Sequence, residues 1–176
     1  MSEIRRAKAA DRDNVVRLWM DLLRSQGEID GRYAPADDAE VRWRNDFDEW
    51  LDRDSRRLLV AVVDDQVRGF ITAERWAPPP IFRLSLEVYV DELYVEPKFR
   101  RSGIGSSLIS AIKQWAEELG AERIRAGVLA SNEDGGAFWA AAGGEVMSVT
   151  FGIDLSRAKG AGNEHESERG RIGFFG

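Results

Sequence analysis

The chain has 176 residues, a formal net charge of -6 and no cysteine. This length fits one domain with a sizeable core and would be cramped for two. The acidic balance argues against nucleic acid or an anionic membrane as a partner. The missing cysteines exclude disulfides, thiolate nucleophiles and cysteine-ligated metals.

Two further features narrow the class of protein. The N-terminal segment MSEIRRAKAADRD lacks the apolar run of a signal peptide, and no window approaches the roughly 18 apolar residues of a membrane span. We therefore expect a cytoplasmic protein. The single histidine, His165, lies in a stretch rich in Gly, Glu and Arg, so we expect no histidine-based triad and no metal site.

Hydrophobic periodicity predicts two helices and three strands in the first half of the chain. Gly27 and Gly31 predict a loop over 25–35 between the helices, and the second helix has apolar residues at Val41, Trp43, Phe47, Trp50 and Leu51 that we expect to be buried. The five elements are a strand over 4–6, a helix with Asp11 as N-cap, a helix over about 37–51, and strands over 58–63 and 67–76.

The second half predicts an alternation of strands and helices after three consecutive prolines. A strand followed by a helix and another strand at this spacing forms a parallel β-α-β unit. The predicted fold class is α/β (α+β), with a mixed, largely antiparallel central sheet and this parallel unit within it. We expect one domain over 1–155 and a flexible tail over 156–176. The predicted elements are strands over 84–95, 123–129 and 145–155 and helices over 104–119 and 132–142.

A glycine turn joins the strand over 84–95 to the helix that follows. The first N–H groups of a helix have no partner within it, and the helix dipole adds partial positive charge there, so a phosphate is a natural ligand. Gly103 and Gly105 remove side chains that would hold an anion away, and Arg100 and Arg101 bring two guanidinium groups to the same place. The turn therefore predicts a pyrophosphate site.

Two common nucleotide motifs do not fit this turn. The dinucleotide motif G-x-G-x-x-G requires a third glycine within an early β-α-β unit, whereas this turn has two glycines and follows four predicted strands. The P-loop motif G-x-x-x-x-G-K-[ST] is absent.

Three segments together resemble the GNAT superfamily of acyl-CoA-dependent N-acetyltransferases, over about 4–155. They are IRRAKAADRDNVVRLW, LYVEPKFRRSGIGSSLI and VLASNEDGGAFWAAAGGE. The resemblance implies acetyl-CoA as co-substrate, with the strand backbone pairing with the pantetheine arm, in the manner of an added strand, and the glycine turn holding the pyrophosphate. The residues that it assigns to the cofactor are Leu93, Tyr94, Val95, Arg100, Arg101, Ser102, Gly103, Ile104, Gly105, Ser106, Asn132 and Trp139.

An acidic pair precedes the turn and supplies the candidate general base. A substrate ammonium must lose a proton before it attacks, which calls for a carboxylate or a water held by one. Asp91 is favoured by strand parity and Glu92 by reach, because only one of two neighbours faces the site unless a bulge intervenes. Glu87 and Tyr89 are further candidates, and the alternative for the pair is that one carboxylate faces solvent or pairs with an arginine.

Trp139 occupies the position at which family members often carry a tyrosine that protonates the departing thiolate. An indole N–H is too weak an acid for this task, although it can donate a hydrogen bond, and a core-packing role is the alternative for Trp139. A water, Tyr94 or Tyr33 would then supply the proton, or the thiolate would leave unaided because thiols have a pKa near about 8.5.

The sequence thus predicts an enzyme that transfers acetyl from acetyl-CoA to a primary amine by direct attack in a ternary complex. The alternative is a catalytically weak acyl-CoA-binding regulatory module on the same fold. The acceptor is a small-molecule or peptide amine: a polyamine, an aminoglycoside, an amino acid, or a protein lysine or N-terminus. The resemblance is also compatible with a homodimer. Acidic residues of the second helix either attract this cation or form a solvated helix face.

Overall fold

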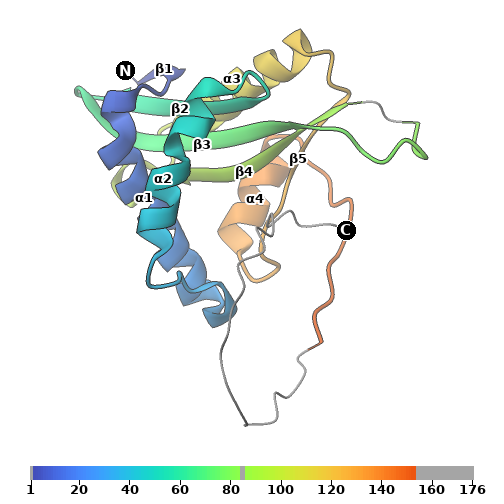
Figure 1. Cartoon of the computed structure of the whole chain (residues 1–176). Coiled ribbons are helices and arrows are strands. Elements are labelled where there is room, and N and C mark those ends of the chain that lie inside the picture. Colours follow the sequence, from blue (N-terminus) through green and yellow to red (C-terminus); the bar gives the residue numbers. More distant parts are fainter. Residues whose placement is uncertain (1, 84–85, 154–176) are drawn as a thin grey trace.

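A five-stranded sheet lies between two layers of helix in the computed structural model, which describes residues 2–83 and 86–153 (Figure 1). Pairing is antiparallel from the first strand to the fourth and parallel between the fourth and the fifth. The mixed, largely antiparallel sheet that the sequence predicts is therefore confirmed. In spatial order the strands are β1 (Glu3–Arg6), β2 (Arg56–Val63), β3 (Gln66–Trp76), β4 (Glu87–Val95) and β5 (Arg123–Ala126).

Helices cover both faces of this sheet (Figure 1). α1 (Arg12–Ile29) and α2 (Ala39–Asp52) lie on one face. α3 (Ile104–Glu118) and α4 (Glu133–Ala141) pack on the other. Three short 3-10 turns complete the described elements: η1 (Ala9–Asp11), η2 (Gly31–Tyr33) and η3 (Pro97–Phe99).

The two layers give two cores because successive residues of a strand point to opposite faces. Val60 and Phe70 pack against α1 and α2, whereas their neighbours Leu59 and Ile71 pack against α3. The strands are apolar on both faces for this reason. The side of the sheet that each residue of β4 faces can then be read from the core that it joins.

β4 has a neighbour on both sides for only part of its length. Its pairing with β5 runs from Glu87 opposite Arg123 to Val90 opposite Ala126 and then stops, whereas its pairing with β3 continues to Val95. Residues 91–95 therefore present an open edge on the side where β5 has ended. The pantetheine pairing that the resemblance implies needs an open strand edge of this kind.

The helix α1 is longer than the sequence predicts. The expected loop over 25–35 begins with helix up to Ile29, and Gly27 lies inside it. A Cβ at Gly27 would lie 2.9 Å from the Cα of Ala34, so this glycine allows the returning chain to approach closely instead of ending the helix. Asp11 does precede the helix, but its carboxylate binds Arg5 and the Lys8 N–H, and it caps no N–H of α1.

The predicted last strand is wrong over the part that the structure describes. Residues 145–153 are in no strand, and Phe151 and Ile153 are 89% and 86% exposed. The apolar alternation here is typical of a strand, but a strand also needs a partner strand, and none of the described strands pairs with this segment. The strand expected over 123–129 likewise ends at Ala126. The expected tail over 156–176 lies outside the described residues.

Burial in α2 follows the prediction at its centre. Trp43 and Phe47 are buried, whereas Val41 is 60% exposed because it lies on the outer face of the helix. No helix in the described ranges is long and apolar enough to cross a membrane.

Candidate functional site

A β-bulge at Asp91 determines where the acidic pair points. Ala73 of β3 pairs with Val90 and the residue before it, Thr72, pairs with Glu92, so Asp91 has no partner on β3. A bulge inserts one residue and reverses the parity of the strand beyond it. Val90 faces α3 before the bulge, and Leu93 faces α3 after it.

The reversal brings both carboxylates to the face that α1 and α2 cover. Glu92 receives a hydrogen bond from Trp19 of α1, and the charged groups that act on Asp91 are Glu92, Glu74 and Arg56. The parity that the sequence suggests for Asp91, shared with Leu93, does not hold across the bulge. The bulge instead allows two adjacent residues to serve one site.

Glu92 is held firmly by its neighbours. Trp19 Nε1 donates to its Oε1 at 3.2 Å, and the Thr72 hydroxyl donates to its Oε2. The Glu92 N–H in turn donates to the Thr72 oxygen at 3.0 Å. Burial raises the pKa of Glu92, and the two side-chain hydrogen bonds oppose this shift because they favour the charged form.

Asp91 is freer than Glu92 and titrates near neutrality. Solvent reaches its side chain, yet the protein around it raises its pKa to about 8. Burial is the main cause, repulsion from Glu92 and Glu74 adds to it, and Arg56 opposes it. A carboxyl with this pKa can accept and release a proton near neutral pH.

The shifted pKa of Asp91 makes stability depend on pH. The folded protein binds this proton more tightly than the unfolded chain, whose aspartate has a pKa of 3.8, so the free energy of unfolding falls as pH rises from there to about 8. Asp91→Asn removes this dependence. We expect the melting temperature of the variant relative to wild type to rise across that pH range. A difference that stays constant with pH would contradict the shift.

Trp19 and Thr72 are site residues that the sequence did not reveal. Trp19 has the spacing of a core residue on α1, and its ring does pack against Trp43 at 5.2 Å between centroids. Only the bulge and the strand register bring its N–H to Glu92. Thr72 lies beside Glu92 because β3 and β4 pair in this register, and the sequence does not reveal the register.

We expect Trp19→Phe to destabilise the fold by about 0.5–1.5 kcal/mol, because it removes one hydrogen bond and keeps an aromatic ring. Chemical denaturation of wild type, Trp19→Phe, Glu92→Gln and the double variant measures the coupling. Additivity of the two changes within about 0.3 kcal/mol would show that the hydrogen bond contributes nothing.

The other candidates on β4 differ in availability. Glu87 is 1% exposed and forms ion pairs with Arg123 at 3.5 Å and Arg125 at 3.4 Å, so its carboxylate is not available as a base. Tyr89 is partly buried, and burial together with Asp91 raises its pKa. Tyr94 is buried in the core under α1 and α2, and burial raises its pKa too. Tyr33 lies exposed on η2.

The open edge of β4 exposes the backbone groups of Leu93 and Val95. The N–H of Glu96 donates to Arg68 on β3 at 2.9 Å, so alternation directs the peptide groups of Val95 and Leu93 away from β3. The Val95 carbonyl indeed accepts from Arg100 Nε at 3.0 Å. These are the positions that the resemblance assigns to the pantetheine arm.

The first turn of α3 follows directly, and we call it the cradle because the sequence predicts an anion site there. Gly103 precedes the helix with φ +86, in the left-handed region that glycine adopts without strain, and no side chain caps the helix. The N–H of Ser107 makes an early bond of the helix, to Gly103 at 2.9 Å, which leaves the N–H groups of Ile104, Gly105 and Ser106 directed outward.

The arginines and glycines of the turn have separate roles. Arg100 lies over the Tyr94 ring at 5.4 Å, and Arg101 has a left-handed backbone with φ 59. The Ser102 hydroxyl donates to the Phe99 carbonyl at 2.6 Å and shapes the turn. A Cβ at Gly105 would lie 3.0 Å from the Phe138 ring, so this glycine allows α4 to pack against α3.

Asn132 and Trp139 lie at the start and in the body of α4. Asn132 caps the helix, because its Oδ1 accepts from the Gly135 N–H at 2.9 Å, and its amide N–H₂ is left to donate elsewhere. Trp139 is partly buried against the α3 core, with its ring edge-on to Phe138 at 5.6 Å. Trp139 therefore packs in the folded chain, as the core-packing alternative expects.

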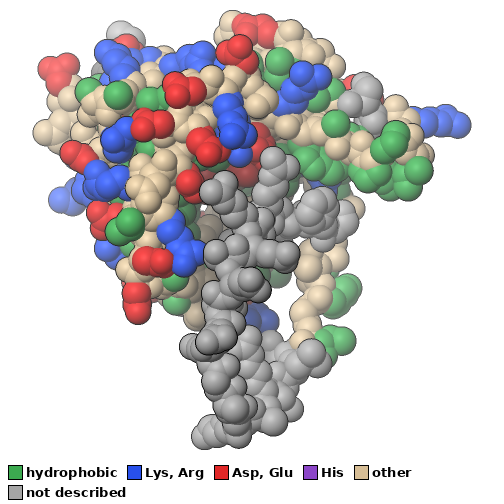
Figure 2. Space-filling model, viewed as in Figure 1, with side chains coloured by type: hydrophobic (Ala, Val, Ile, Leu, Met, Phe, Trp, Pro, Cys, Tyr) green, Lys and Arg blue, Asp and Glu red, His purple; other side chains and the backbone are tan. Residues whose placement is uncertain are grey.

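Charges on the outer face of α2 are largely paired. Figure 2 shows positive and negative side chains interleaved over α1 and α2. Asp38, Glu40, Asp48 and Glu49 all form ion pairs with arginines, which favours a solvated helix face over a cation-binding groove. Within the described ranges, no group of three or more His, Cys, Asp or Glu is placed to hold a metal ion.

The sequence of this chain matches the model of a known protein family. The model of the acetyltransferase (GNAT) family matches residues 17–143. A protein of Archaeoglobus fulgidus described as an uncharacterized N-acetyltransferase is 33% identical over 117 residues, which cover 66% of this chain and 74% of that protein.

Solved structures share the fold at lower identity. A tetramutant of the BH1408 protein from Bacillus halodurans has a TM-score of 0.78 at 21% identity, over 87% of this chain and 99% of that one. The aminoglycoside acetyltransferase AAC(6')-Iy, in complex with the bisubstrate analogue CoA-S-monomethyl-acetylneamine, has a TM-score of 0.71 at 22% identity, over 88% and 99%.

Proposed function

Because the chain belongs to the GNAT acetyltransferase family, we propose that it transfers an acetyl group from acetyl-CoA to a primary amine. The observation that carries the proposal is the open edge of β4, which leads without interruption into the uncapped first turn of α3. Acetyl-CoA would supply the acetyl thioester. Its pantetheine amides would pair with Leu93 and Val95, and its pyrophosphate would accept from the N–H groups of 104–106.

Asp91 is the general base of this proposal. It takes a proton from the substrate ammonium, directly or through one water, so that the amine lone pair can attack the thioester carbon. The nitrogen of the resulting adduct loses its second proton to water, the bond from the carbon to sulfur breaks, and the thiolate leaves with its electron pair. Glu92, held in place by Trp19 and Thr72, presents a second carboxyl group to the incoming cation. No cysteine is present to form a thioester acyl-enzyme, which favours direct transfer.

We assign no side chain as the acid for the departing thiolate. The raised pKa of Tyr89 and of Tyr94 makes both phenols poorer proton donors. The indole N–H of Trp139 is too weak an acid to protonate the thiolate. A thiol pKa near about 8.5 allows the thiolate to leave unaided and take its proton from water.

The acceptor we propose is a cationic amine with more than one charge, of the polyamine or aminoglycoside type. Asp91, Glu92 and Glu74 interact with one another on the face under α1 and α2, where they favour positive charge. The neighbour AAC(6')-Iy is an aminoglycoside acetyltransferase, which supports the same class.

Incubation of the purified protein with acetyl-CoA and a library of polyamines, aminoglycosides, amino acids and lysine peptides tests this function. Mass spectrometry should detect acetylated polyamine or aminoglycoside, with amine-dependent release of CoA. Tight CoA binding without acetylation of any amine would instead identify an acyl-CoA-binding module.

A further inference from the structure

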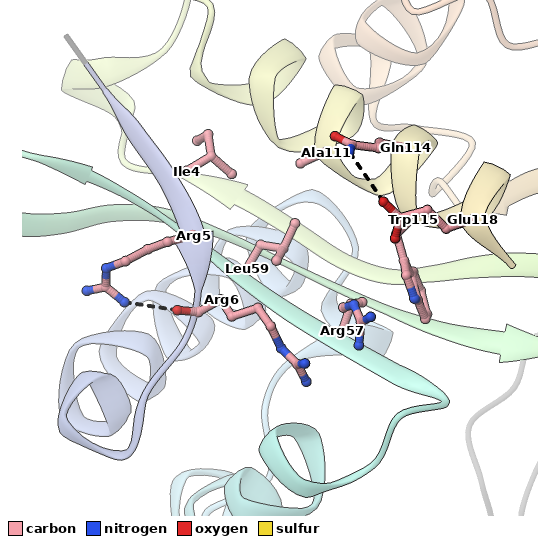
Figure 3. Close-up of a pocket in the computed structure, with 9 residues that line it drawn as sticks. All are labelled: Ile4, Arg5, Arg6, Arg57, Leu59, Ala111, Gln114, Trp115 and Glu118. Atoms are coloured by element: carbon pink, nitrogen blue, oxygen red, sulfur yellow. Dashed lines mark hydrogen bonds between the residues drawn. The ribbon is translucent and has the colours of Figure 1, made fainter.

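A pocket of about 260 Å³ lies between the second half of α3 and the strands β1 and β2 (Figure 3). Its helical residues, from Ala111 to Glu118, fall in the last turns of α3, whereas the anion cradle is the first turn of the same helix. The pocket is therefore separate from the site proposed for acetyl-CoA.

The floor of the pocket is apolar. Ile4, Leu59 and Ala111 line it, and all three pack against the core under α3. Apolar surface of this kind accommodates the hydrocarbon part of a ligand.

Two guanidinium groups lie at the pocket without a carboxylate partner. Within the described part of the chain their side chains form only long hydrogen bonds to backbone carbonyls, from Arg6 to Leu51 at 3.5 Å and from Arg57 to Arg56 at 3.4 Å, and neither forms an ion pair. Burial lowers the pKa of Arg57, and repulsion from Arg6 lowers it further. Asp54 and Glu118 oppose this shift without forming an ion pair with Arg57 in the described residues, so both guanidinium groups keep N–H donors for an anion.

Trp115 adds a donor that has no acceptor. Its side chain lines the pocket and is 4% exposed, and its Nε1 is buried without a hydrogen-bond partner. The Arg57 guanidinium lies 4.8 Å from the centre of the indole. Buried donors in native proteins are usually paired, so an acceptor supplied by a ligand would remove this exception.

We propose that this pocket binds a small organic carboxylate with an apolar body. The carboxylate accepts from Arg6 and Arg57, beside the Trp115 indole, and the apolar body lies on Ile4 and Leu59. Glu118 also lines the pocket and repels a doubly charged phosphate more strongly than a singly charged carboxylate. A planar carboxylate matches the fork of an arginine. This inference does not depend on the acetyl-transfer function.

Hydrocinnamate is a suitable probe, with NMR of the isotope-labelled full chain as the measurement. The indole N–H signal that disappears in Trp115→Phe identifies Trp115. We expect hydrocinnamate to shift this signal saturably and the uncharged hydrocinnamamide to leave it in place. Arg57→Gln and Arg6→Gln should each weaken binding at least about tenfold.

Arg42→Gln is the matched control, because Arg42 is an exposed arginine that pairs with Asp38 on α2, and it should bind the probe as wild type does. Acetyl-CoA should not displace the probe. The proposal is overturned if hydrocinnamate produces no saturable shift, if the amide binds equally well, or if acetyl-CoA competes. Wild-type affinity in a folded Arg6→Gln variant would overturn it too, even if Arg57→Gln fails to fold.

Discussion

Asp91→Asn should reduce amine-dependent acetyl transfer by about 10²–10⁴-fold, the usual contribution of a general base. The amide is nearly isosteric with the carboxyl but cannot accept the ammonium proton. Affinity for acetyl-CoA should stay at the wild-type level, because the cradle and the edge residues Leu93 and Val95 are unchanged. The rate constant kcat and the dissociation constant for CoA, measured separately, check both expectations.

The pH dependence of the rate gives the same residue a second test. The base must be deprotonated to act, and the pKa of Asp91 is raised to about 8, so wild-type activity should rise with pH up to about that value. Asp91→Asn should lose this rise. Asp64→Asn is a suitable control, because Asp64 lies in the β2–β3 turn with φ 50, a conformation that asparagine tolerates. Unchanged kcat in Asp91→Asn would exclude Asp91 as the base.

Gly103→Val should weaken acetyl-CoA binding at least about tenfold. Gly103 has φ +86 immediately before α3, and a β-branched residue in the left-handed region costs about 1–2 kcal/mol. The backbone would relax by turning the first N–H groups of the helix away from the pyrophosphate. Isothermal titration with CoA measures the loss, and the free energy of unfolding should fall by a comparable amount.

The control for this glycine is Gly31→Ala. Gly31 has no atom within 4 Å of an added Cβ and no positive φ, so alanine should fit there without strain. Wild-type CoA affinity in Gly103→Val would show that the turn does not hold the pyrophosphate.

Sequence reasoning located the cradle because its signal is local. Gly103, Gly105 and the arginines before them are adjacent in the chain, and a strand followed by a glycine turn and a helix determines where the N–H groups point. The reasons for the two glycines nevertheless differ from the prediction. Gly103 is required by its backbone conformation, whereas Gly105 makes room for Phe138 of α4, a contact that no local pattern contains.

The arrangement of the acidic pair could not be predicted in the same way. Whether Asp91 and Glu92 share a face depends on a bulge, and the bulge exists only in the register between β3 and β4. Trp19 reaches Glu92 across 73 positions of sequence, so its role depends on tertiary packing. A residue with core periodicity can thus complete a site, and only the fold reveals it.

In the segment over 145–153 the sequence predicts a strand that the structure does not contain. Its alternation of apolar residues is typical of a strand, yet alternation reports which side chains share a face and not whether a partner strand is present. Gly27 misled for a related reason, since a glycine that permits close packing has the same appearance in the sequence as one that ends a helix.

The most direct measurement is the release of free CoA thiol from acetyl-CoA by the purified protein, with and without a polyamine or aminoglycoside. The chain has no cysteine, so a thiol reagent detects only CoA. We predict release that requires the amine, saturates with its concentration and is abolished in Asp91→Asn. Release that never exceeds the amine-free rate, in a protein that binds CoA, would contradict the proposed acetyl transfer.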